Sequence, residues 1–325
     1  MKISVVIPVK NEADSIRDLL DALLNQTLPP DQILVTDGGS IDGTLAILKD
    51  YDRLHSSIHV FPEGGAMPGR GRNVGAANAA NEWIAFIDAG VTPASNWLEE
   101  LAKCAVQDEH VDVVFGTWQP VTDTLFTECA AIAYAYVPLS DDVLELEKTR
   151  AIFTSLMRRK VWETIGGFRE DLRSAEDHLF IREIYSNNFK VVDTAHAVVR
   201  WTMQPTAWRT FKRFAVYSRH NMRAGLANNW QNAILIRYLI LFVAIAAILF
   251  VTDWWPIIGA SLLLAFLSSR ALLALLRNRR KFPASVTRAI QRFFVLVPLL
   301  FLLDLASLLG AADWLIRDKL WPTQR

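Results

Sequence analysis

The sequence has few of the residues that would indicate a disulfide-bonded or metal-clustered protein. Its 325 residues include only two cysteines, Cys104 and Cys129, whose separation matches no metal-ligand spacing and allows at most one disulfide bridge. Such sparse cysteine use favours a reduced, cytoplasmic environment. The formal net charge is zero, so the overall charge of the chain gives no attraction for nucleic acid. We expect no nucleic-acid partner.

We also expect no secretory signal peptide in the first residues. The apolar stretch Met1–Val9 is cut short by a polar run from Lys10 to Asp14, whereas a signal peptide needs an uninterrupted apolar region. What the sequence has in excess is apolar residues, at 52%, and their distribution changes near residue 232. Before that point apolar runs are short, and after it they are long enough to suggest a membrane region.

The first part of the chain alternates short apolar runs with helical patterns. The runs suit strands buried on both faces of a sheet, and they are Ile3–Ile7, Gln32–Val35, Ile58–Phe61, Trp83–Ile87 and Val111–Phe115. Helix-start signals precede Glu12–Leu24, Thr44–Tyr51 and Ser95–Ala105. This alternation predicts a parallel sheet with helices on both faces. Ligands gather beyond the carboxyl ends of such strands, where Asp37 and Asp88 fall.

Three long apolar segments near the C-terminus are each close to the roughly 20 residues that a bilayer requires. They are Ala233–Val251, Trp254–Leu276 and Phe293–Leu315. The loop after the second is rich in cations between Arg277 and Arg288, whereas the turn after the first has none, so the positive-inside rule predicts that the soluble domain lies in the cytoplasm. Within the segments, Arg270 is near enough to one end to snorkel, and Asp304 is expected to face another helix.

Two further segments have the composition of helices at a membrane surface. Thr206–Gly225 interleaves aromatic and cationic residues at helical spacing. Asp123–Leu139 is apolar and aromatic, and is either a surface-associated helix or a core helix. We therefore divide the chain into a soluble domain at residues 1–205, an interfacial helix at 206–231 and a membrane region at 232–325.

Three aspartates are candidates for a functional site, although each has a purely structural interpretation. Asp37 in VTDGGSIDGT could form an Asx turn, and Asp88 could form a turn after its strand. Asp177 follows Ser174-Ala-Glu, which fits a helix capping box. Gly69-Arg70-Gly71-Arg72-Asn73 opens a predicted helix, and glycines with arginines at a helix N-terminus are typical of phosphate binding.

The order of these segments resembles the family 2 glycosyltransferases of the GT-A fold. The resemblance rests on SVVIPVKNE, VTDGGSIDGT, GRGRNVGAANAANEWIAFIDAG and GGFREDLRSAEDHLF, and covers about residues 2–185. It implies an α/β fold of GT-A type, with a Rossmann-like, mostly parallel sheet sandwiched by helices and followed here by an α-helical membrane region. It further implies inverting transfer of a sugar from a nucleotide-sugar donor.

The resemblance also assigns roles to individual residues. Asp177 would be the catalytic base, and Asp88 would hold the ribose-diphosphate end of the donor. The remaining donor-binding residues would be Pro8, Val9 and Glu12 in the nucleotide pocket, Asp37 at the base, and Arg72 and Asn73 beside the diphosphate.

One position departs from the family pattern. The family usually reads Asp-x-Asp where this chain has Asp88-Ala89-Gly90, and the second aspartate commonly ligates Mg²⁺ or Mn²⁺. Either Asp88 and the diphosphate hold the divalent cation more weakly, or cations such as Arg72 neutralise part of the charge. The chain also lacks the Gln-x-x-Arg-Trp pattern of processive polymer synthases, which favours a single-addition enzyme.

These features predict a multi-pass protein of the cell membrane, acting in cell-envelope glycan synthesis with its catalytic domain in the cytoplasm. Its partners would be a nucleotide-sugar donor, a lipid-linked or membrane-proximal acceptor, and the bilayer. An alternative is a catalytically silent nucleotide-sugar-binding or scaffold subunit, which Gly90 motivates. A sugar nucleotidyltransferase would need a glycine-rich loop after the first strand, and PVKNEADS contains no glycine.

Overall fold

The computed structural model describes residues 1–135, 146–147, 149–227, 231–249 and 254–321. It comprises two compact units, each built from two stretches of chain. The first unit contains Met1–Val121 and Val137–Thr202, and the second contains Thr122–Tyr136 and Met203–Arg325. The expected boundary at residue 205 falls close to the change from the first unit to the second between Thr202 and Met203. The segment Thr122–Tyr136, however, belongs with the C-terminal helices.

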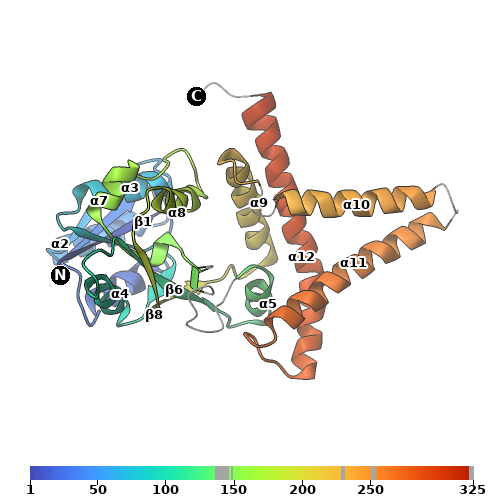
Figure 1. Ribbon diagram of the computed structural model, residues 1–325, viewed down its shortest axis with the longest axis horizontal. Coiled ribbons are helices and arrows are strands. Elements are labelled where there is room, and N and C mark those ends of the chain that lie inside the picture. Colours follow the sequence, from blue (N-terminus) through green and yellow to red (C-terminus); the bar gives the residue numbers. More distant parts are fainter. Residues whose placement is uncertain (136–145, 148, 228–230, 250–253, 322–325) are drawn as a thin grey trace. The chain divides into compact units, whose positions relative to one another are not determined.

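The first unit is built around one mixed sheet of eight strands, in the order β3-β2-β1-β4-β7-β6-β8-β5 (Figure 1). The strands are β1 Ile3–Val9, β2 Gln32–Asp37, β3 Ile58–Pro62, β4 Trp83–Phe86, β5 Val91–Pro93, β6 Val113–Val121, β7 Ser155–Arg158 and β8 Val191–Thr202. Strands β1 to β4 pair in parallel. Their carboxyl ends therefore lie along one edge of the sheet, as expected for a nucleotide-binding half.

Helices of the first unit alternate with these strands. They are α1 Ile16–Leu24, α2 Thr44–Leu54, α3 Pro68–Asn78, α4 Trp97–Val106, α7 Arg159–Ile165 and α8 Glu176–Ser186, with a short 3₁₀ turn η1 at Ile152–Thr154. The helix expected from Glu12 begins at Ile16 instead. Asn11 does not start it, because its side chain accepts a hydrogen bond from the backbone amide of Ile41 at 2.9 Å.

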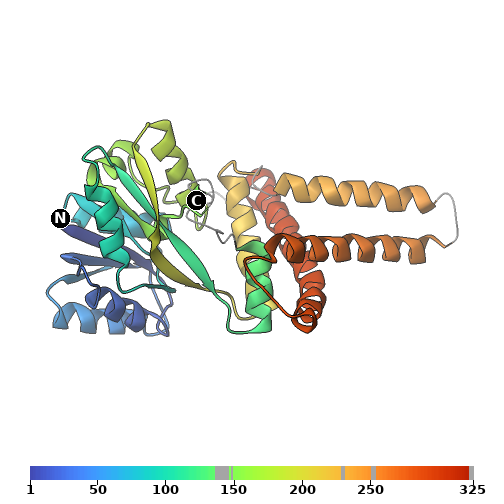
Figure 2. The ribbon, with the colours of Figure 1, turned by 60° about the horizontal axis from the view of Figure 1, so that its bottom comes forward.

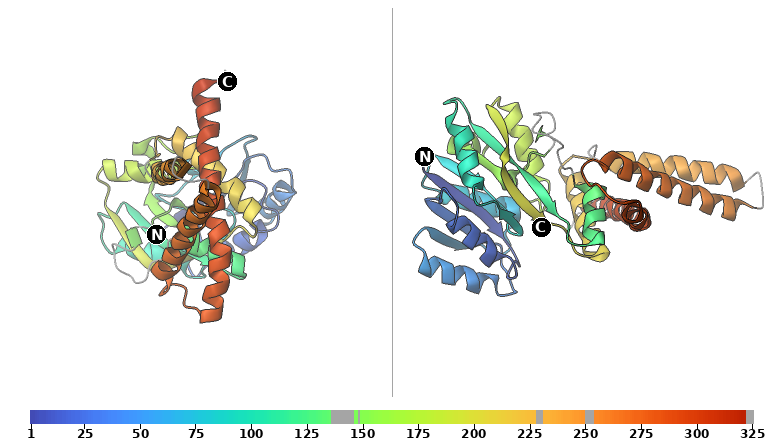
Figure 3. Two further views of the ribbon diagram at one scale, coloured as in Figure 1. Left: turned by 90° about the vertical axis from the view of Figure 1, so that its right-hand side faces the viewer. Right: turned by 90° about the horizontal axis from the view of Figure 1, so that it is seen from below.

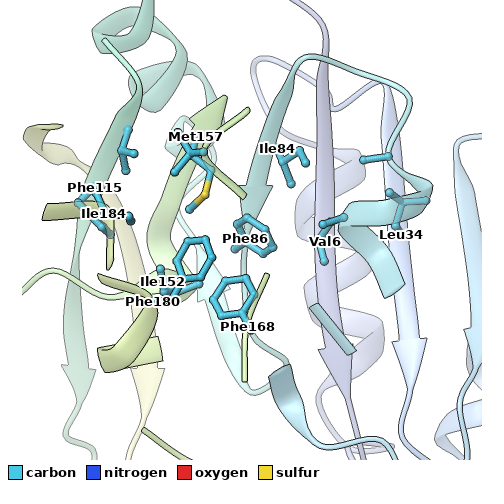
Figure 4. Close-up of a cluster of buried hydrophobic side chains, with 14 residues drawn as sticks. Val6, Leu34, Ile84, Phe86, Phe115, Ile152, Met157, Phe168, Phe180 and Ile184 are labelled. Atoms are coloured by element: carbon cyan, nitrogen blue, oxygen red, sulfur yellow. The ribbon is translucent and has the colours of Figure 1, made fainter. Parts of the chain in front are cut away.

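The main apolar cluster joins the sheet to α3, α7 and α8 (Figure 4). Phe86 of β4 packs edge to face on Phe168, with ring centroids 5.4 Å apart, and Phe168 stacks on Phe180 of α8 at 4.0 Å. All three side chains are buried. Burial of aromatic rings is among the largest apolar contributions available to a core. This stack fixes α8, which carries Asp177, against the strand that leads to Asp88.

The sheet is less uniformly parallel than strand-helix alternation predicted. Strand β7 pairs antiparallel with both β4 and β6, and the short strand β5 pairs antiparallel with β8. The sequence analysis did not identify β8, because Val191–Thr202 contains an aspartate, a histidine and an arginine. Nonetheless β8 pairs in parallel with β6 at both of its ends, from Val113 with Val191 to Val121 with Thr202, with a register shift between Phe115 and Thr117.

The second unit is helical. Its helices are α5 Leu125–Tyr134, α9 Ala207–Arg223, α10 Gln231–Leu249, α11 Trp255–Asn278 and α12 Val286–Trp314, which continues into a π-helical turn η2 at Leu315–Leu320. Figure 2 shows α10 and α11 side by side as a hairpin. The expected surface helix at Thr206–Gly225 corresponds to α9. Of the expected helix Asp123–Leu139, the portion past Ala135 lies outside the described residues.

Two helices in the described part of the chain are long and apolar enough to cross a membrane, α11 and the continuous helix Val286–Leu320. They correspond to the second and third expected spans. The first, Ala233–Val251, corresponds to α10, in which Gln231–Ala247 forms a shorter apolar helix than the other two, and residues 250–251 lie outside the described region. Length and composition therefore support membrane association through two of the three predicted segments.

Two charged residues well inside the apolar helices, Arg270 and Asp304, pair with each other. Arg270 of α11 donates to both carboxylate oxygens of Asp304 on α12, and Tyr238 of α10 donates to Asp304 at 2.9 Å. The expectation that Asp304 faces a helix partner is confirmed. Arg270 does not need to snorkel, because its charge is compensated within the helix bundle.

Candidate active site

Three of the predicted site residues stand at the ends of the adjacent strands β1 and β2. Pro8 and Val9 end β1, and Asp37 ends β2 in register with Val9. Val9 accepts a hydrogen bond from the amide of Gly38 at 2.9 Å, which ties the two strand ends together. Next to β1 on its other side, β4 leads to Asp88. The strand order thus brings these residues to the same sheet edge.

Asp37 forms the Asx turn that its sequence context allowed. One carboxylate oxygen accepts from the amides of Gly39 and Ser40, each at 3.1 Å, and the other from the hydroxyl of Ser40 at 2.5 Å. Gly39 has φ +83°, which a side chain rarely tolerates. Asp37 is almost fully buried. Its carboxylate therefore stabilises the turn at the strand end. A contact with the nucleotide base, as the resemblance implies, would be a second role of the same side chain.

The Gly-Arg-Gly-Arg segment lies inside α3, and its glycines allow close packing. A Cβ at Gly71 would lie 2.9 Å from Cβ of Pro8, and a Cβ at Gly75 would lie 2.5 Å from Cγ1 of Val6. These glycines are one helical turn apart on the face toward β1. A Cβ at Gly69 would lie 2.0 Å from the carbonyl oxygen of Arg169. The segment thus lets α3 approach both β1 and the loop before α8.

Asn73 uses its whole side chain to fix that loop. Its amide nitrogen donates to the carbonyl of Phe168 and to Glu170, both at 2.9 Å. Its oxygen accepts from the amide of Phe168 at 2.8 Å and from the indole of Trp162 at 3.1 Å. Four bonds are all that an asparagine amide can make. Its predicted place beside a diphosphate would require some of these bonds to be exchanged.

Arg72 links the strand end at Asp88 to the first turn of α8. Its guanidinium donates to Asp88 at 2.7 Å and to Glu176 at 2.6 Å. Arg72 and Glu176 are buried, whereas Asp88 is about one-third exposed. Charge-assisted bonds of this kind are stronger than neutral ones, especially when shielded from water. Arg72 therefore holds two carboxylates together from residues that are far apart in sequence.

The charges of this cluster shift its protonation equilibria. Burial raises the pKa of Glu176 to about 7, the neighbouring Asp177 adds to the rise, and Arg72 opposes it. Burial works against the charged form of Arg72, but the carboxylates of Asp88, Glu176 and Asp177 outweigh it and raise the pKa of Arg72. Asp88 and Asp177 therefore act on the same buried cation, although one follows β4 and the other lies in α8.

Asp177 does not take part in the capping box that its sequence allowed, so that interpretation is wrong. Helix α8 begins at Glu176 after Ala175, whose φ is +73°, and no side chain caps it. The hydroxyl of Ser174 has no hydrogen-bond partner among the described residues. The carboxylate of Asp177 accepts a hydrogen bond from the adjacent amide of His178 at 2.8 Å. It is partly exposed, so its carboxylate is accessible from outside the protein.

Comparison with known proteins agrees with this geometry. The family model for glycosyl transferase family 2 matches residues 4–166, a range that includes β1 to β4, α3 and Asp88. The chain belongs to this family. The resemblance drawn from four sequence motifs is therefore confirmed, and the α/β fold with an apolar helical C-terminal region is as predicted.

Individual members of family 2 are distant from this chain. It is 29% identical to glycosyltransferase AglE of Haloferax volcanii over 181 residues, which cover 54% of the chain and 58% of AglE. It is 28% identical over 195 residues to the poly(ribitol-phosphate) beta-N-acetylglucosaminyltransferase TarS of Staphylococcus aureus, covering 58% of the chain and 33% of TarS. The chain thus spans little more than half of the one relative and a third of the other.

The fold also matches a solved structure over most of its length. The mannosyltransferase PcManGT from Pyrobaculum calidifontis, in complex with GDP-Man and Mn²⁺, superposes with a TM-score of 0.57 and 18% identity. The match covers 94% of this chain and 87% of PcManGT. At this identity the likeness establishes the fold and nothing finer.

The side chains around Asp88 provide few ligands for a divalent cation. No group of three or more His, Cys, Asp or Glu side chains that could hold a metal occurs among the described residues. Gly90, at φ +85°, replaces the second aspartate of the family pattern. A Cβ there would lie 3.6 Å from both carboxylate oxygens of Glu12. Two carboxylates, Asp88 and Glu12, thus border this position, and Mg²⁺ sites often use one or two carboxylates with substrate phosphates.

Glu176 is the site residue that sequence reasoning missed. The signal was available, since Glu176 and Asp177 are adjacent acids at the expected start of a helix, but only Asp177 was singled out. The buried hydrogen bond between Arg72 and Glu176 could not be derived from the sequence, because the two residues are 104 positions apart along the chain.

Proposed function

We propose that this protein is a membrane-anchored, inverting glycosyltransferase. It transfers a sugar from a nucleotide-sugar donor to a lipid-linked or membrane-proximal acceptor at the cytoplasmic face of a membrane. The observation that carries the proposal is the convergence of Asp88 and Asp177 on Arg72 at the sheet edge where GT-A proteins bind their donor. Membership of family 2 and the names of AglE and TarS support the reaction class.

The proposed chemistry assigns different roles to Asp177 and to the pair Asp88 and Arg72. Asp177, at the start of α8, takes the proton from the acceptor hydroxyl as it attacks the anomeric carbon, and attack in line with the leaving group inverts that centre. Negative charge then builds on the departing nucleoside diphosphate. Asp88 and Arg72 lie on the donor side. We assign donor contacts to Pro8, Val9, Glu12, Asp37, Arg72, Asn73 and Asp88, as the resemblance implies.

A divalent cation is part of this proposal. Asp88 would hold Mg²⁺ or Mn²⁺, with Glu12 bordering the space that Gly90 leaves empty. The cation would supply positive charge to the diphosphate when bound. The Mn²⁺ in the PcManGT complex supports this choice for a protein of the same fold.

The acceptor and the location follow from the second unit. Two apolar helices long enough to span a bilayer would keep the enzyme at a membrane, where a lipid-borne acceptor diffuses in two dimensions. The cations of the segment Arg277–Lys281 favour the cytoplasmic side for the adjoining helix ends. The TarS name, which specifies a poly(ribitol-phosphate) acceptor, supports a role in the synthesis of envelope glycans.

The test is transfer measured with the full chain in detergent or liposomes. A panel of UDP-, GDP- and dTDP-sugars, with and without Mn²⁺, is supplied together with polyprenyl phosphate or a lipid extract as acceptor. We expect turnover with one donor class and a product of inverted anomeric configuration. Retained configuration would overturn the inverting mechanism.

The alternative function is a silent nucleotide-sugar-binding subunit of a membrane assembly, motivated by Gly90. It predicts donor binding without turnover for any donor, and unchanged biological function after Asp177→Asn. Titration of each nucleotide by calorimetry, alongside the transfer assay, separates the two functions. Turnover that is lost in Asp177→Asn excludes the silent subunit.

A further inference from the structure

Helix α12 has two faces of different character. The buried face contains nine residues, Arg292, Leu296, Leu299, Leu300, Leu303, Asp304, Ala306, Ser307 and Gly310. The opposite face is apolar and exposed, at Ile290, Phe294, Phe301, Leu305, Leu309 and Ile316. Their spacing of four or seven residues places them on one stripe of the helix. A helix crossing lipid alone would be exposed all round, so α12 is partly covered within its own unit.

A polar helix covers the second half of α12. Ser218 of α9 donates to the carbonyl of Ser307 at 2.6 Å, and a Cβ at Gly310 would lie 2.2 Å from the carbonyl oxygen of Ala215. Further along, Arg219 pairs with Asp313 and Asp318, each at 3.1 Å. Helix α9 contains five cations, Arg209, Lys212, Arg213, Arg219 and Arg223. A helix with this many charges does not enter the hydrocarbon core.

Helix α5 binds the first turns of α12. Glu128 accepts from Arg288 at 2.7 Å and from Arg292 at 2.9 Å. Helices α5 and α9 also touch each other, since the rings of Tyr134 and Phe214 lie 4.8 Å apart. The two helices follow β6 and β8 in the chain, and these strands end as paired neighbours. Both therefore lie on the same side of any membrane.

The part of α12 left between these two attachments is too short to cross a bilayer. About 15 residues separate Arg292 from Ser307, which is about 22 Å of helix at 1.5 Å per residue. The hydrocarbon core is about 30 Å thick. The interval also contains Asp304. If α12 were a span, either α9 or the ion pairs of α5 would have to sit at membrane depth.

Helices α10 and α11 differ from α12 in this respect. They form a hairpin whose side chains are mostly exposed, with only 17% of the apolar window of α11 buried. Figures 1 and 3 show α12 running across the foot of this hairpin, not alongside it. The contacts between them cluster there, at Arg270 with Asp304. From Tyr238, which contacts Asp304 of α12, α10 continues to Leu249, about 16 Å of helix, so the hairpin enters the bilayer core from the level of α12 and returns.

We propose that the α10–α11 hairpin inserts into the bilayer while α12 lies in the plane of the membrane surface. The exposed stripe from Ile290 to Ile316 contacts the acyl chains, and α5 and α9 cover the opposite face beside the lipid headgroups. The partner of this surface is the lipid bilayer itself. Because the hairpin returns the chain to its starting side and α12 does not cross, the C-terminal end of α12 lies on the same side as the first unit. Three spans would put it on the other side.

Cysteine labelling of the full chain in membrane vesicles tests this topology. In a Cys104→Ser, Cys129→Ala background, single variants Lys10→Cys, Arg279→Cys and Leu320→Cys are treated with a membrane-impermeant maleimide in right-side-out and inside-out vesicles. Labelling after detergent lysis shows that each thiol is reactive. We expect all three to react in the same vesicle orientation. Reaction of Leu320→Cys in the orientation opposite to Lys10→Cys overturns the proposal.

Depth measurement gives an independent test that does not rely on the helix end. Spin labels at Phe294, Phe301 and Leu309 occupy the exposed stripe, and power saturation with oxygen and a nickel chelate reports their depth in liposomes. An in-plane helix gives depths that agree within about one helical pitch, 5.4 Å. A span gives depths that differ by roughly 20 Å over these positions, which overturns the proposal. Neither result depends on the sugar-transfer reaction, which is assayed separately.

Discussion

Arg72 donates to Glu176 across 2.6 Å, and both side chains are buried. The same guanidinium holds Asp88 at 2.7 Å. A single cation thus fixes the distance between the strand end on the donor side and the helix that carries Asp177. The arrangement of the proposed site depends on this contact more than on any other described pair.

Replacing Arg72 by an uncharged residue should lower the free energy of unfolding. Arg72→Met leaves two carboxylates without a partner, and breaking a buried ion pair from one side typically costs about 3–5 kcal/mol. We expect a loss of this size in the free energy of unfolding, measured by chemical denaturation of the full chain in detergent micelles. Arg72→Met combined with Glu176→Gln should recover part of the loss. A loss below about 1 kcal/mol would show that the pair is not buried as described.

The raised pKa of Glu176 predicts a pH dependence of stability. Burial raises this pKa from 4.5 to about 7, so between these values the folded state binds more protons than the unfolded chain. The free energy of unfolding should therefore fall as pH rises through this window, by up to about 1.4 kcal/mol per pH unit. Glu176→Gln should flatten the curve between pH 4.5 and 7. An equally steep curve in that variant would assign the effect to another group.

Asp177→Asn should abolish transfer without weakening donor binding. Asparagine keeps the shape of the side chain but cannot accept the acceptor's proton, and general base catalysis contributes typically about 10²–10⁴-fold. We expect the turnover rate to fall within this range, while the donor dissociation constant from calorimetry stays within about twofold. Glu183→Gln, which removes an acid further along α8, serves as the control. If both variants lose activity equally, Asp177 has no special role.

The close approach of α3 to β1 predicts a steric effect at Gly75. Gly75→Ala would place a methyl group 2.5 Å from Cγ1 of Val6, and overpacking of this kind costs typically about 1–3 kcal/mol. Gly64→Ala is the matched control, since nothing lies within 4 Å of a Cβ there. Val6→Ala combined with Gly75→Ala should relieve the clash. Equal melting temperatures for Gly75→Ala and Gly64→Ala would contradict the packing.

The divalent cation can be tested by binding alone. Mn²⁺ binding to the full chain, followed by electron paramagnetic resonance in the presence of a nucleoside diphosphate, should weaken by about tenfold or more in Asp88→Asn. Asp108→Asn, at a carboxylate that pairs with Lys190, should bind like the natural chain. Unchanged binding in Asp88→Asn would remove this residue from the proposed metal site.

Local patterns in the sequence were sufficient to predict much of the first unit. Apolar runs such as Ile3–Ile7 and Trp83–Ile87 match β1 and β4 because buried parallel strands are continuously apolar. Strand β8 was missed because its exposed Arg200 and His196 interrupt that pattern. Its place is fixed by pairing with β6, a contact between distant segments that no local pattern contains.

The site was predictable in its residue types but not in its contacts. Asp88 and Asp177 could be selected because they end or begin regular elements at positions that a family pattern marks. The capping box predicted at Ser174 was wrong because the backbone at Ala175 turns left-handed, and that angle is set by the packing around it. Similarly, the glycines of GRGRN suggested phosphate binding, although their neighbours in the fold explain them as contact points of a helix.

The strained backbone at Ala175 sets the direction in which the chain enters α8. With right-handed angles at this residue, the helix would continue backward through Ser174 and carry the preceding segment away from Gly69, which now touches the carbonyl of Arg169. A left-handed alanine costs of order 1 kcal/mol, and glycine would remove that cost. One unfavourable torsion angle therefore sets the direction of the helix that carries Asp177.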